Sequence, residues 1–175
     1  MGTLLVAAFA GLALLRLATL RLDSPLGRLR DGLLEGMSAP EWELRDTTGR
    51  PRRVPHGSKW QLLVFGDYTL VEFPGVVAAL QRLEAQRDEL EILLLSRVDE
   101  NVTVRTAQAL KLDVPVVSVD DDLYWRYNVR VMPFVFVVQP DGIVRSSGVV
   151  SAEEVLLNMW RLARVVPLEH AGANA

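Results

Sequence analysis

The chain has 175 residues, a formal net charge of −3 at pH 7 and a sequence pI of about 5.4, so it lacks the basic surplus that nucleic-acid-binding proteins usually show. Half of its residues are hydrophobic, which suits one domain with a substantial core plus an appendage. The absence of cysteine excludes disulfides, thiolate nucleophiles, iron–sulfur clusters and thiolate-bound zinc. Its two histidines, His56 and His170, show no spacing to carboxylates that suggests a metal site. We therefore expect neither a metal nor another cofactor.

The N-terminal segment is the most apolar part of the chain. It carries a single charge, Arg16, between Thr3 and Leu20. A membrane-spanning helix needs about 20 apolar residues, and an arginine near its end can extend to the lipid headgroups. The pattern predicts a single transmembrane anchor at residues 1–22, with membrane contact through residues 3–20. A cleaved signal peptide, whose basic start is missing here, and a buried amphipathic helix are the alternatives.

The arginines of this region bear on the orientation of the anchor. No Lys or Arg precedes the apolar segment, whereas Arg16, Arg21, Arg28 and Arg30 lie at its end or beyond it. Because cytoplasmic flanks of membrane helices carry the excess of Lys and Arg, this distribution would place the globular part in the cytoplasm.

The composition divides the rest of the chain into three parts. Residues 23–37 contain the Gly, Pro and Arg typical of a linker, residues 38–166 are expected to form the globular domain, and residues 167–175 form a C-terminal tail. At the start of the domain, Glu41 to Leu44 alternates like a half-buried strand, and a turn follows. After that turn comes the basic cluster Gly49-Arg50-Pro51-Arg52-Arg53, which we interpret as a solvated loop, with a phosphate site as the alternative.

Continuous apolar runs predict the central strands. They lie at Trp60–Gly66, Leu90–Ser96 and Phe134–Val138, with a shorter strand in Val114–Val119. After the first run, Pro74 suits the first turn of a helix, in which Val76, Val77, Leu80 and Leu83 recur at helical spacing.

Three further helices and a hairpin complete the domain. The helices are expected at Asn101–Leu112, at Asp120–Val129 with acidic residues at its N-terminal end, and from the capping box at Ser151 to about Val165. Turn chemistry at residues 139–142 predicts a hairpin after the third central strand. Alternating strands and helices that end in an antiparallel hairpin and a closing helix indicate an α/β fold, with a mixed sheet and helices on both faces.

Four landmarks of this chain resemble a known family. "LLEGMSAPEWELRDTTGR" is similar to a G-x-x-A-P-x-F-x-L-x-D-x-x-G segment, and "LLVFGDYTLVEFPGVVAALQRL" matches, without a gap, the strand and helix that carry a Cys-Pro-x-Cys motif. "VRVMPFVFVVQPDGIVRSSGVV" is similar to a cis-proline loop with its hairpin, and the N-terminal anchor is the fourth landmark. Together they resemble the thioredoxin fold in its membrane-anchored TlpA-like redoxin branch, most closely the bacterial methylamine-utilisation thioredoxin-like accessory protein (MauD-type). The resemblance covers about Leu33 to Trp160 plus the anchor.

The chain departs from this family at the active-site loop. Counting on from Phe65, Leu70 stands where the first cysteine of the family lies and Phe73 stands at the second. Neither side chain has the chemistry of a thiolate. The disulfide reductase, isomerase and peroxidase activities of the family are therefore excluded for this chain acting alone, and no catalytic residue is carried over.

The resemblance also implies a surface that binds a partner. Pro133, preceded by Met132, matches the family's cis-proline, whose loop pairs with an extended segment of the partner. We expect a partner-binding patch formed by Asp67, Tyr68, Thr69, Leu70, Val71, Glu72, Phe73, Met132 and Pro133, because exposed apolar patches usually mark contact sites. Alternatively, Leu70 and Phe73 fill the core, and Asp67 and Tyr68 are ordinary surface. Trp125 and Tyr127 are expected to pack rather than to stack on a cofactor.

These features favour a redox-inactive, membrane-tethered thioredoxin-like module for binding or assembly, or a structural subunit, that holds a partner protein at this groove. The partner would be a subunit of a membrane complex or an exported polypeptide, and not a nucleic acid. One alternative is an enzyme with non-thiol acid–base chemistry at Glu72 or Asp67. Another is a thioredoxin-like domain on the inner face of the membrane that assists complex assembly. The resemblance implies a periplasmic domain, because that family also carries positive charge just after its anchor; the cytoplasmic side is the alternative.

Overall fold

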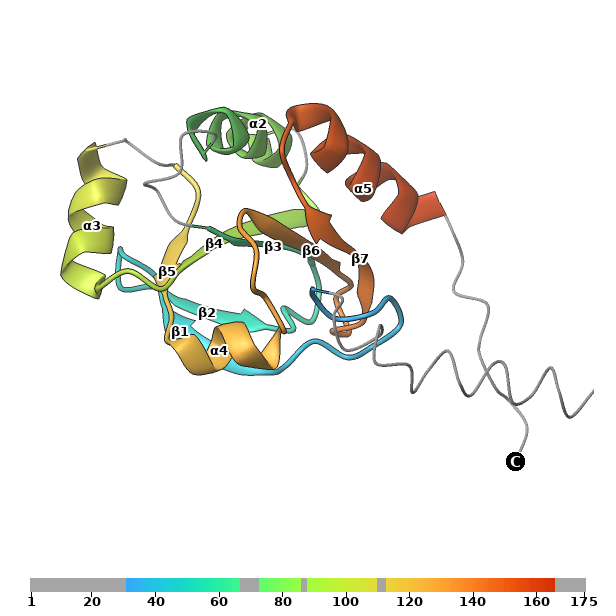
Figure 1. Cartoon of the computed structure of the whole chain (residues 1–175), viewed down its shortest axis with the longest axis horizontal. Helices are drawn as coiled ribbons and strands as arrows, with labels where there is room; N and C mark the ends of the chain where they lie inside the picture. Colours follow the sequence, from blue (N-terminus) through green and yellow to red (C-terminus); the bar gives the residue numbers. More distant parts are fainter. Residues whose placement is uncertain (1–30, 67–72, 86–87, 110–112, 166–175) are drawn as a thin grey trace, which may run out of the picture. The chain divides into compact units, whose positions relative to one another are not determined.

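The structure is a computed structural model, and it describes residues 31–66, 73–85, 88–109 and 113–165, shown in colour in Figure 1. The predicted anchor at residues 1–22, with its membrane contact at residues 3–20, and the predicted tail at residues 167–175 lie outside these residues. Among the helices that are described, none has both the length and the apolar character needed to cross a membrane.

A five-stranded mixed sheet forms the centre of the domain. Its strands are β3 (Trp60–Phe65), β4 (Leu90–Ser96), β5 (Val116–Ser118), β6 (Phe134–Val138) and β7 (Val144–Val149), in the order β5-β4-β3-β6-β7. β3, β4 and β5 are parallel, whereas β6 runs antiparallel to β3 and β7 antiparallel to β6. Every residue of β4 and β6 is buried, so the continuous apolar runs correctly predicted the central strands.

Helices cover both faces of this sheet, as predicted. They are α2 (Phe73–Ala85), α3 (Glu100–Ala109), α4 (Asp121–Arg126) and α5 (Glu153–Val165). In Figure 1, α2 and α5 lie on one side of the sheet and α4 lies on the other. Along β3, Leu62 and Val64 belong to the core cluster shared with α2 and α5, whereas Leu63 and Phe65 belong to the cluster shared with α4. This division follows from the alternation of side chains along a strand.

The prediction that Trp125 and Tyr127 pack against the domain is right for Tyr127, which caps the end of α4, and wrong for Trp125. Tyr127 is fully buried and its ring lies 5.0 Å from that of Phe65. Trp125, in contrast, is 69% exposed. A helix as short as α4 buries only one side, here through Leu123 and Tyr124, and Trp125 falls on the other. Asn128 then ends the helical region with a left-handed φ of 54°.

A two-stranded hairpin precedes the main sheet. It pairs β1 (Trp42–Arg45) with β2 (Pro51–Val54). The sequence predicted β1, although only Trp42 is half-buried and the rest of the strand is exposed. β2 falls on the basic cluster that we interpreted as a solvated loop, and that interpretation is wrong. Proline is tolerated at the start of an edge strand, so Pro51 does not prevent the pairing.

Arg52 of β2 anchors this hairpin to the main sheet. Its guanidinium lies 2.9 Å from Asp46 Oδ2 and 2.9 Å from Glu91 Oε1. The other Glu91 oxygen accepts from the buried Gln61 amide at 2.7 Å. Because two carboxylates already hold Arg52, the cluster does not present it as a phosphate ligand.

The C-terminal part of the predicted linker packs against the domain. Gly36 N–H donates to Val144 C=O at 2.8 Å, and Val144 N–H donates to Met37 C=O at 2.9 Å. The Ser147 hydroxyl donates to Leu33 C=O at 2.8 Å. These contacts run along the outer side of β7, so the domain contacts begin before Ser38.

Candidate functional site

The candidate site lies where the parallel strands end. β3, β4 and β5 run in the same direction, so their carboxyl ends meet at one edge of the sheet, where the antiparallel β6 begins. Gly66, Arg97 and Val119 directly follow these strands, and Pro133 directly precedes β6. In open α/β sheets, ligands usually bind outside the carboxyl ends of the strands.

The loop before β6 has the geometry expected at Pro133. The Met132–Pro133 peptide bond is cis. Pro133 is buried and its C=O accepts from Val150 N–H at 3.1 Å. Met132 is half-buried against the core cluster of α4, and Val131 is 44% exposed. Within the described part of the chain, the backbone groups of Val131 and Met132 make no hydrogen bond.

Most of the predicted partner-binding patch cannot be placed. The predicted residues Asp67, Tyr68, Thr69, Leu70, Val71 and Glu72 lie outside the described residues. Phe73 is the first residue of α2, but its side chain is not among those described. Met132 and Pro133 are therefore the two members of the patch whose surroundings the structure gives.

Arg97, at the end of β4, joins this edge to α4. Its guanidinium lies 5.4 Å from the centre of the Tyr124 ring and 3.9 Å from Asp121 Oδ1. The Tyr124 hydroxyl donates to the backbone C=O of Leu95 at 3.1 Å. Both charged side chains are exposed, so this ion pair contributes little to the stability of the fold. The guanidinium of Arg97 also lies over the Tyr124 ring.

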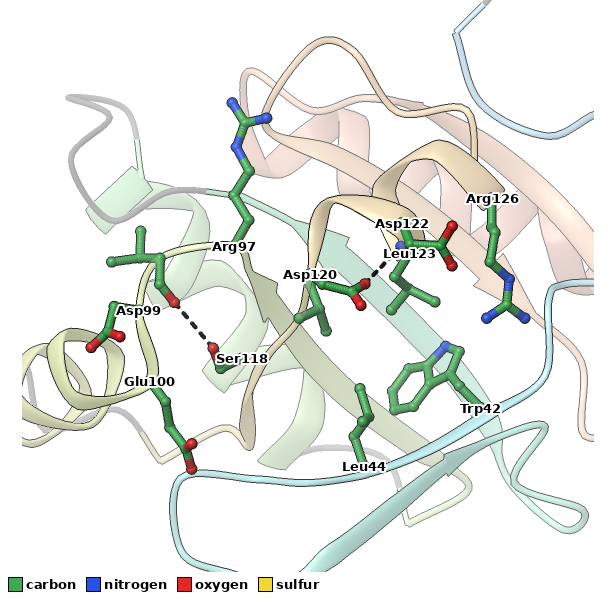
Figure 2. A pocket seen from close by; sticks show the side chains of 12 residues that line it. Trp42, Leu44, Arg97, Asp99, Glu100, Ser118, Asp120, Asp122, Leu123 and Arg126 are labelled. Atoms are coloured by element: carbon green, nitrogen blue, oxygen red, sulfur yellow. Dashed lines mark hydrogen bonds between the residues drawn. The ribbon is translucent and has the colours of Figure 1, made fainter.

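A cavity of about 530 Å³ opens beside the same edge, between β1 and the ends of β4 and β5. Figure 2 shows Trp42 and Leu44 on one side of it, Asp99 and Glu100 on the other, and Ser118 and Asp120 between them. Four acidic and two basic residues are among those that line it, namely Asp99, Glu100, Asp120, Asp122, Arg97 and Arg126. The cavity therefore combines an apolar wall with an excess of negative charge.

Local capping explains why carboxylates gather here. Asp120 Oδ1 accepts from Leu123 N–H at 3.0 Å and caps α4. Asp99 Oδ1 accepts from Asn101 N–H at 2.9 Å at the start of α3. Short acceptor side chains are favoured at these positions because the first N–H groups of a helix lack partners within it.

Tyr127 fixes the Trp42 wall of the cavity. The Trp42 indole N–H donates to the Tyr127 hydroxyl at 3.2 Å, and that hydroxyl donates to Pro40 C=O at 3.0 Å. Burial raises the pKa of Tyr127 well above its ordinary value, and the hydrogen bond from Trp42 offsets only part of this effect. The phenol therefore stays protonated at physiological pH, and its hydroxyl acts as a structural hydrogen-bonding group.

The described residues contain no group of three His, Asp or Glu side chains placed to hold a metal ion. The described residues at this edge of the sheet form a surface of half-buried apolar side chains and backbone groups, with a charged cavity beside it. The cavity was not predicted from the sequence. The available signal was that an acidic residue stands within about three positions of the end of two buried strands, Asp99 after β4 and Asp120 after β5, and such residues meet at one sheet edge.

The fold and the missing thiol together define the class of this chain: it has a thioredoxin-like fold and no cysteine. The sequence matches no protein-family model and no curated protein. Among solved structures, the chain is similar to the peroxidoxin BcpB from Mycobacterium tuberculosis, with 16% identity, a TM-score of 0.66, and 79% of this chain and 99% of that chain covered.

Two further solved structures have the same fold. The thioredoxin domain of a thiol-disulfide oxidoreductase from Bacteroides vulgatus is 16% identical, with a TM-score of 0.61 and 75% of this chain and 99% of that chain covered. StoA from Bacillus subtilis is 15% identical, with a TM-score of 0.60 and coverage of 70% and 97%. At these identities the similarity establishes the fold alone.

Proposed function

We propose that this chain is a redox-inactive, membrane-tethered binding module that holds a protein partner at the loop before β6. The observation that carries the proposal is a thioredoxin-like fold in a chain without cysteine, in which the loop before β6 has an exposed Val131 and a half-buried Met132. Thiol–disulfide exchange requires a thiolate, so this chain alone cannot carry it out, and the proposal rests on the surface of the loop before β6.

The loop before β6 supports an extended polypeptide as the bound segment. Val131 is 44% exposed, Met132 is half-buried, and their backbone groups are not bonded within the described part of the chain. Backbone pairing provides affinity in strand addition, and pockets for alternate side chains provide specificity. Leu70 and Phe73 would complete the patch as its apolar side.

Site-specific photo-crosslinking of the full chain tests the partner site. A crosslinking amino acid is placed at Val131, Met132, Leu70 or Phe73, and at the exposed Val155 and Leu162 of α5 as controls. One and the same partner, identified by mass spectrometry, is expected from the loop positions and not from α5. Equal capture from both groups of positions would contradict the proposal.

We place the domain on the periplasmic side of a membrane, tethered by residues 1–22. The motivation is the apolar N-terminal segment together with the resemblance to a family of anchored, exported proteins. Protease added to intact spheroplasts is expected to digest the domain. A domain that resists until the membrane is lysed would reverse the orientation, and recovery of the full chain in the soluble fraction would remove the anchor from the proposal.

A further inference from the structure

The described chain enters the domain beside the C-terminal end of α4. Gly32 N–H donates to Asn128 C=O at 2.8 Å, and the Asn128 side-chain amide donates to Gly32 C=O at 3.4 Å. Leu33 packs against the core cluster on the α4 side of the sheet. A Cβ at Gly32 would meet the rings of Phe134 and Phe136, which belong to the same cluster. The chain therefore enters the domain on the side of the sheet that carries α4.

Trp125 points outward on this side of the domain. Its side chain is 69% exposed, whereas Leu123 and Tyr124 of the same helix are buried against the sheet. Asn128 N–H donates to Trp125 C=O at 2.9 Å. The same Asn128 holds Gly32 through its carbonyl and its side chain, so Trp125 lies on the helix end at which the chain enters.

Further exposed groups surround the point of entry. Leu34, in the segment that follows it, is 43% exposed. Arg130 is exposed, and its guanidinium donates to the Asn128 side-chain oxygen at 3.2 Å. Asp31 and the exposed Glu35 lie in the same segment as Leu34, so charges of both signs are present. We name the surface formed by three of these side chains the entry face: Leu34, Trp125 and Arg130.

A short tether limits which side of the domain can reach a membrane. Residues 23–31 separate the predicted anchor from Gly32, and nine residues span at most about 30 Å even when fully extended. A compact domain of this length has a diameter of about 35 Å. Contact of the bilayer with the opposite side, which carries α2 and α5 (Figure 1), would place Gly32 farther from the bilayer than the tether reaches. The entry face is therefore the side that lies within reach.

We propose that the entry face rests on the phospholipid surface of the membrane that holds the anchor. Trp125 and Leu34 lie at the boundary between headgroups and acyl chains, and the Arg130 guanidinium binds headgroup phosphates. An indole suits this depth because its ring is apolar and its N–H is polar. Charges of both signs suit zwitterionic headgroups. This inference rests on the membrane tether of the proposed function, and it adds the orientation of the domain, with α4 toward the lipid.

Fluorescence quenching by brominated lipid tests the contact on the full chain. The protein is reconstituted into phosphatidylcholine vesicles whose acyl chains carry bromine close to the headgroup, or carry none. Residues 1–30 contain no tryptophan, so the predicted anchor adds no emission. Bromine is expected to lower the emission of the wild-type chain. This loss is expected to be at least about twofold smaller in Trp125→Phe, because a side chain at the interface lies only about 5–10 Å deep, within contact of such a quencher.

Matched variants locate the contact. Trp60→Phe is the control for Trp125→Phe, since Trp60 packs against the cluster on the α2 and α5 side, and it is expected to keep the loss of emission. Leu34→Ser combined with Arg130→Gln is expected to reduce the loss. Leu162→Ser combined with Arg161→Gln changes an exposed pair on α5 and is expected to leave it unchanged. Equal effects of the two double variants would overturn the entry face as the contact. Circular dichroism checks that each variant folds.

Flotation of the same vesicles separates this inference from the tether itself. A chain that floats with the vesicles but shows no loss of emission dependent on Trp125 would overturn the lipid contact and leave the tether standing. A chain that does not float would overturn the tether and the contact with it. In native membranes, a crosslinking amino acid at Trp125 is expected to give lipid adducts. A discrete protein adduct there would assign the entry face to a protein partner and overturn the lipid contact.

Discussion

Arg52 Nη1 lies 2.9 Å from Glu91 Oε1 and so connects the N-terminal hairpin to the central sheet. The two residues are 39 positions apart in the chain. Glu91 is buried in β4 and Arg52 is half-buried in β2. Because a buried carboxylate is costly unless it is paired and hydrogen-bonded, this contact adds to the Asp46–Val117 bridge and the Trp42–Tyr127 hydrogen bond in holding the hairpin on the sheet.

Replacement of Arg52 by alanine is expected to destabilise the domain by about 2–4 kcal/mol. The substitution leaves two buried carboxylates, Asp46 and Glu91, without their cation. Chemical denaturation measures the free energy of unfolding. Arg50→Ala is the matched control, since its side chain is exposed in the same basic cluster and its loss is expected to cost below about 0.5 kcal/mol. Similar losses of stability in both variants would show that the ion pairs of Arg52 contribute no more than an exposed arginine does.

Asp46 makes stability depend on acid pH. Burial alone would raise its pKa, but hydrogen bonds from Thr48, Arg52 and the backbone N–H groups of Arg50 and Thr48 outweigh burial and lower the pKa below its ordinary value. A carboxyl with a lowered folded-state pKa stabilises the fold above its unfolded pKa, about 4, and loses that contribution as pH falls through the folded value.

The stability gap between wild type and Asp46→Asn is therefore expected to be largest near pH 7 and to shrink below about pH 4. Urea denaturation at a series of pH values measures this gap. Asp88→Asn, at an exposed turn, serves as the control and is expected to show no such trend. A gap that stays constant down to pH 3 would refute the role assigned to the Asp46 carboxylate.

Gly32→Ala is expected to destabilise the domain by about 2–4 kcal/mol, for two reasons. Gly32 has a φ of +81°, which costs a residue with a Cβ about 1 kcal/mol. The added Cβ would also collide with the Phe134 ring, which is buried at the start of β6 and has little room to move. Gly36→Ala separates the two effects, because Gly36 has a φ of +86° and open space around it. Thermal denaturation measures the stability of both variants, and equal losses in Gly32→Ala and Gly36→Ala would exclude an effect of the collision.

Tyr127→Phe is expected to weaken the fold by about 1–3 kcal/mol at neutral pH, because the Trp42 N–H and the Pro40 C=O lose their shared partner. Burial raises the pKa of Tyr127, so its contribution is complete below the unfolded pKa, about 10, and is lost as pH rises toward the folded value. Denaturation between pH 8 and 11 is expected to show a smaller alkaline loss of stability in the variant. An equal loss in both proteins would refute the linkage.

The central strands could be predicted because each is a continuous apolar run. Leu90–Ser96 and Phe134–Val138 coincide with the observed β4 and β6, since a strand covered on both faces is apolar at most positions; in β4 the exceptions are Glu91 and Ser96. The second strand of the hairpin could not be predicted in this way. Pro51, Arg52 and Arg53 look like a polar loop locally, and what makes them a strand is the contact of Arg52 with carboxylates that lie distant in sequence.

Local sequence patterns were also insufficient to predict the whole candidate site. Pro133 could be placed because a cis-proline loop followed by a hairpin is a local pattern. The cavity depends instead on the divergence of β1 from β5, and no local pattern records where two strand edges separate. Single carboxylates such as Asp120 were read correctly as helix-starting residues, but their convergence with Trp42 is a property of the tertiary structure.

Trp125 is expected to dominate the part of the tryptophan fluorescence that comes from solvent-exposed side chains. Of the four tryptophans, Trp160 is buried, Trp42 and Trp60 are half-buried, and Trp125 is 69% exposed. Trp125→Phe is expected to shift the emission maximum to shorter wavelength and to lower the acrylamide quenching constant, with little change in stability, because most of the side chain is exposed. Trp160→Phe is the contrasting variant: it removes a ring packed edge-to-face on Trp60 at 5.8 Å and is expected to cost about 1–3 kcal/mol. A Trp125→Phe protein with unchanged quenching would show that this face of α4 is covered in solution, which would make it a contact surface in its own right.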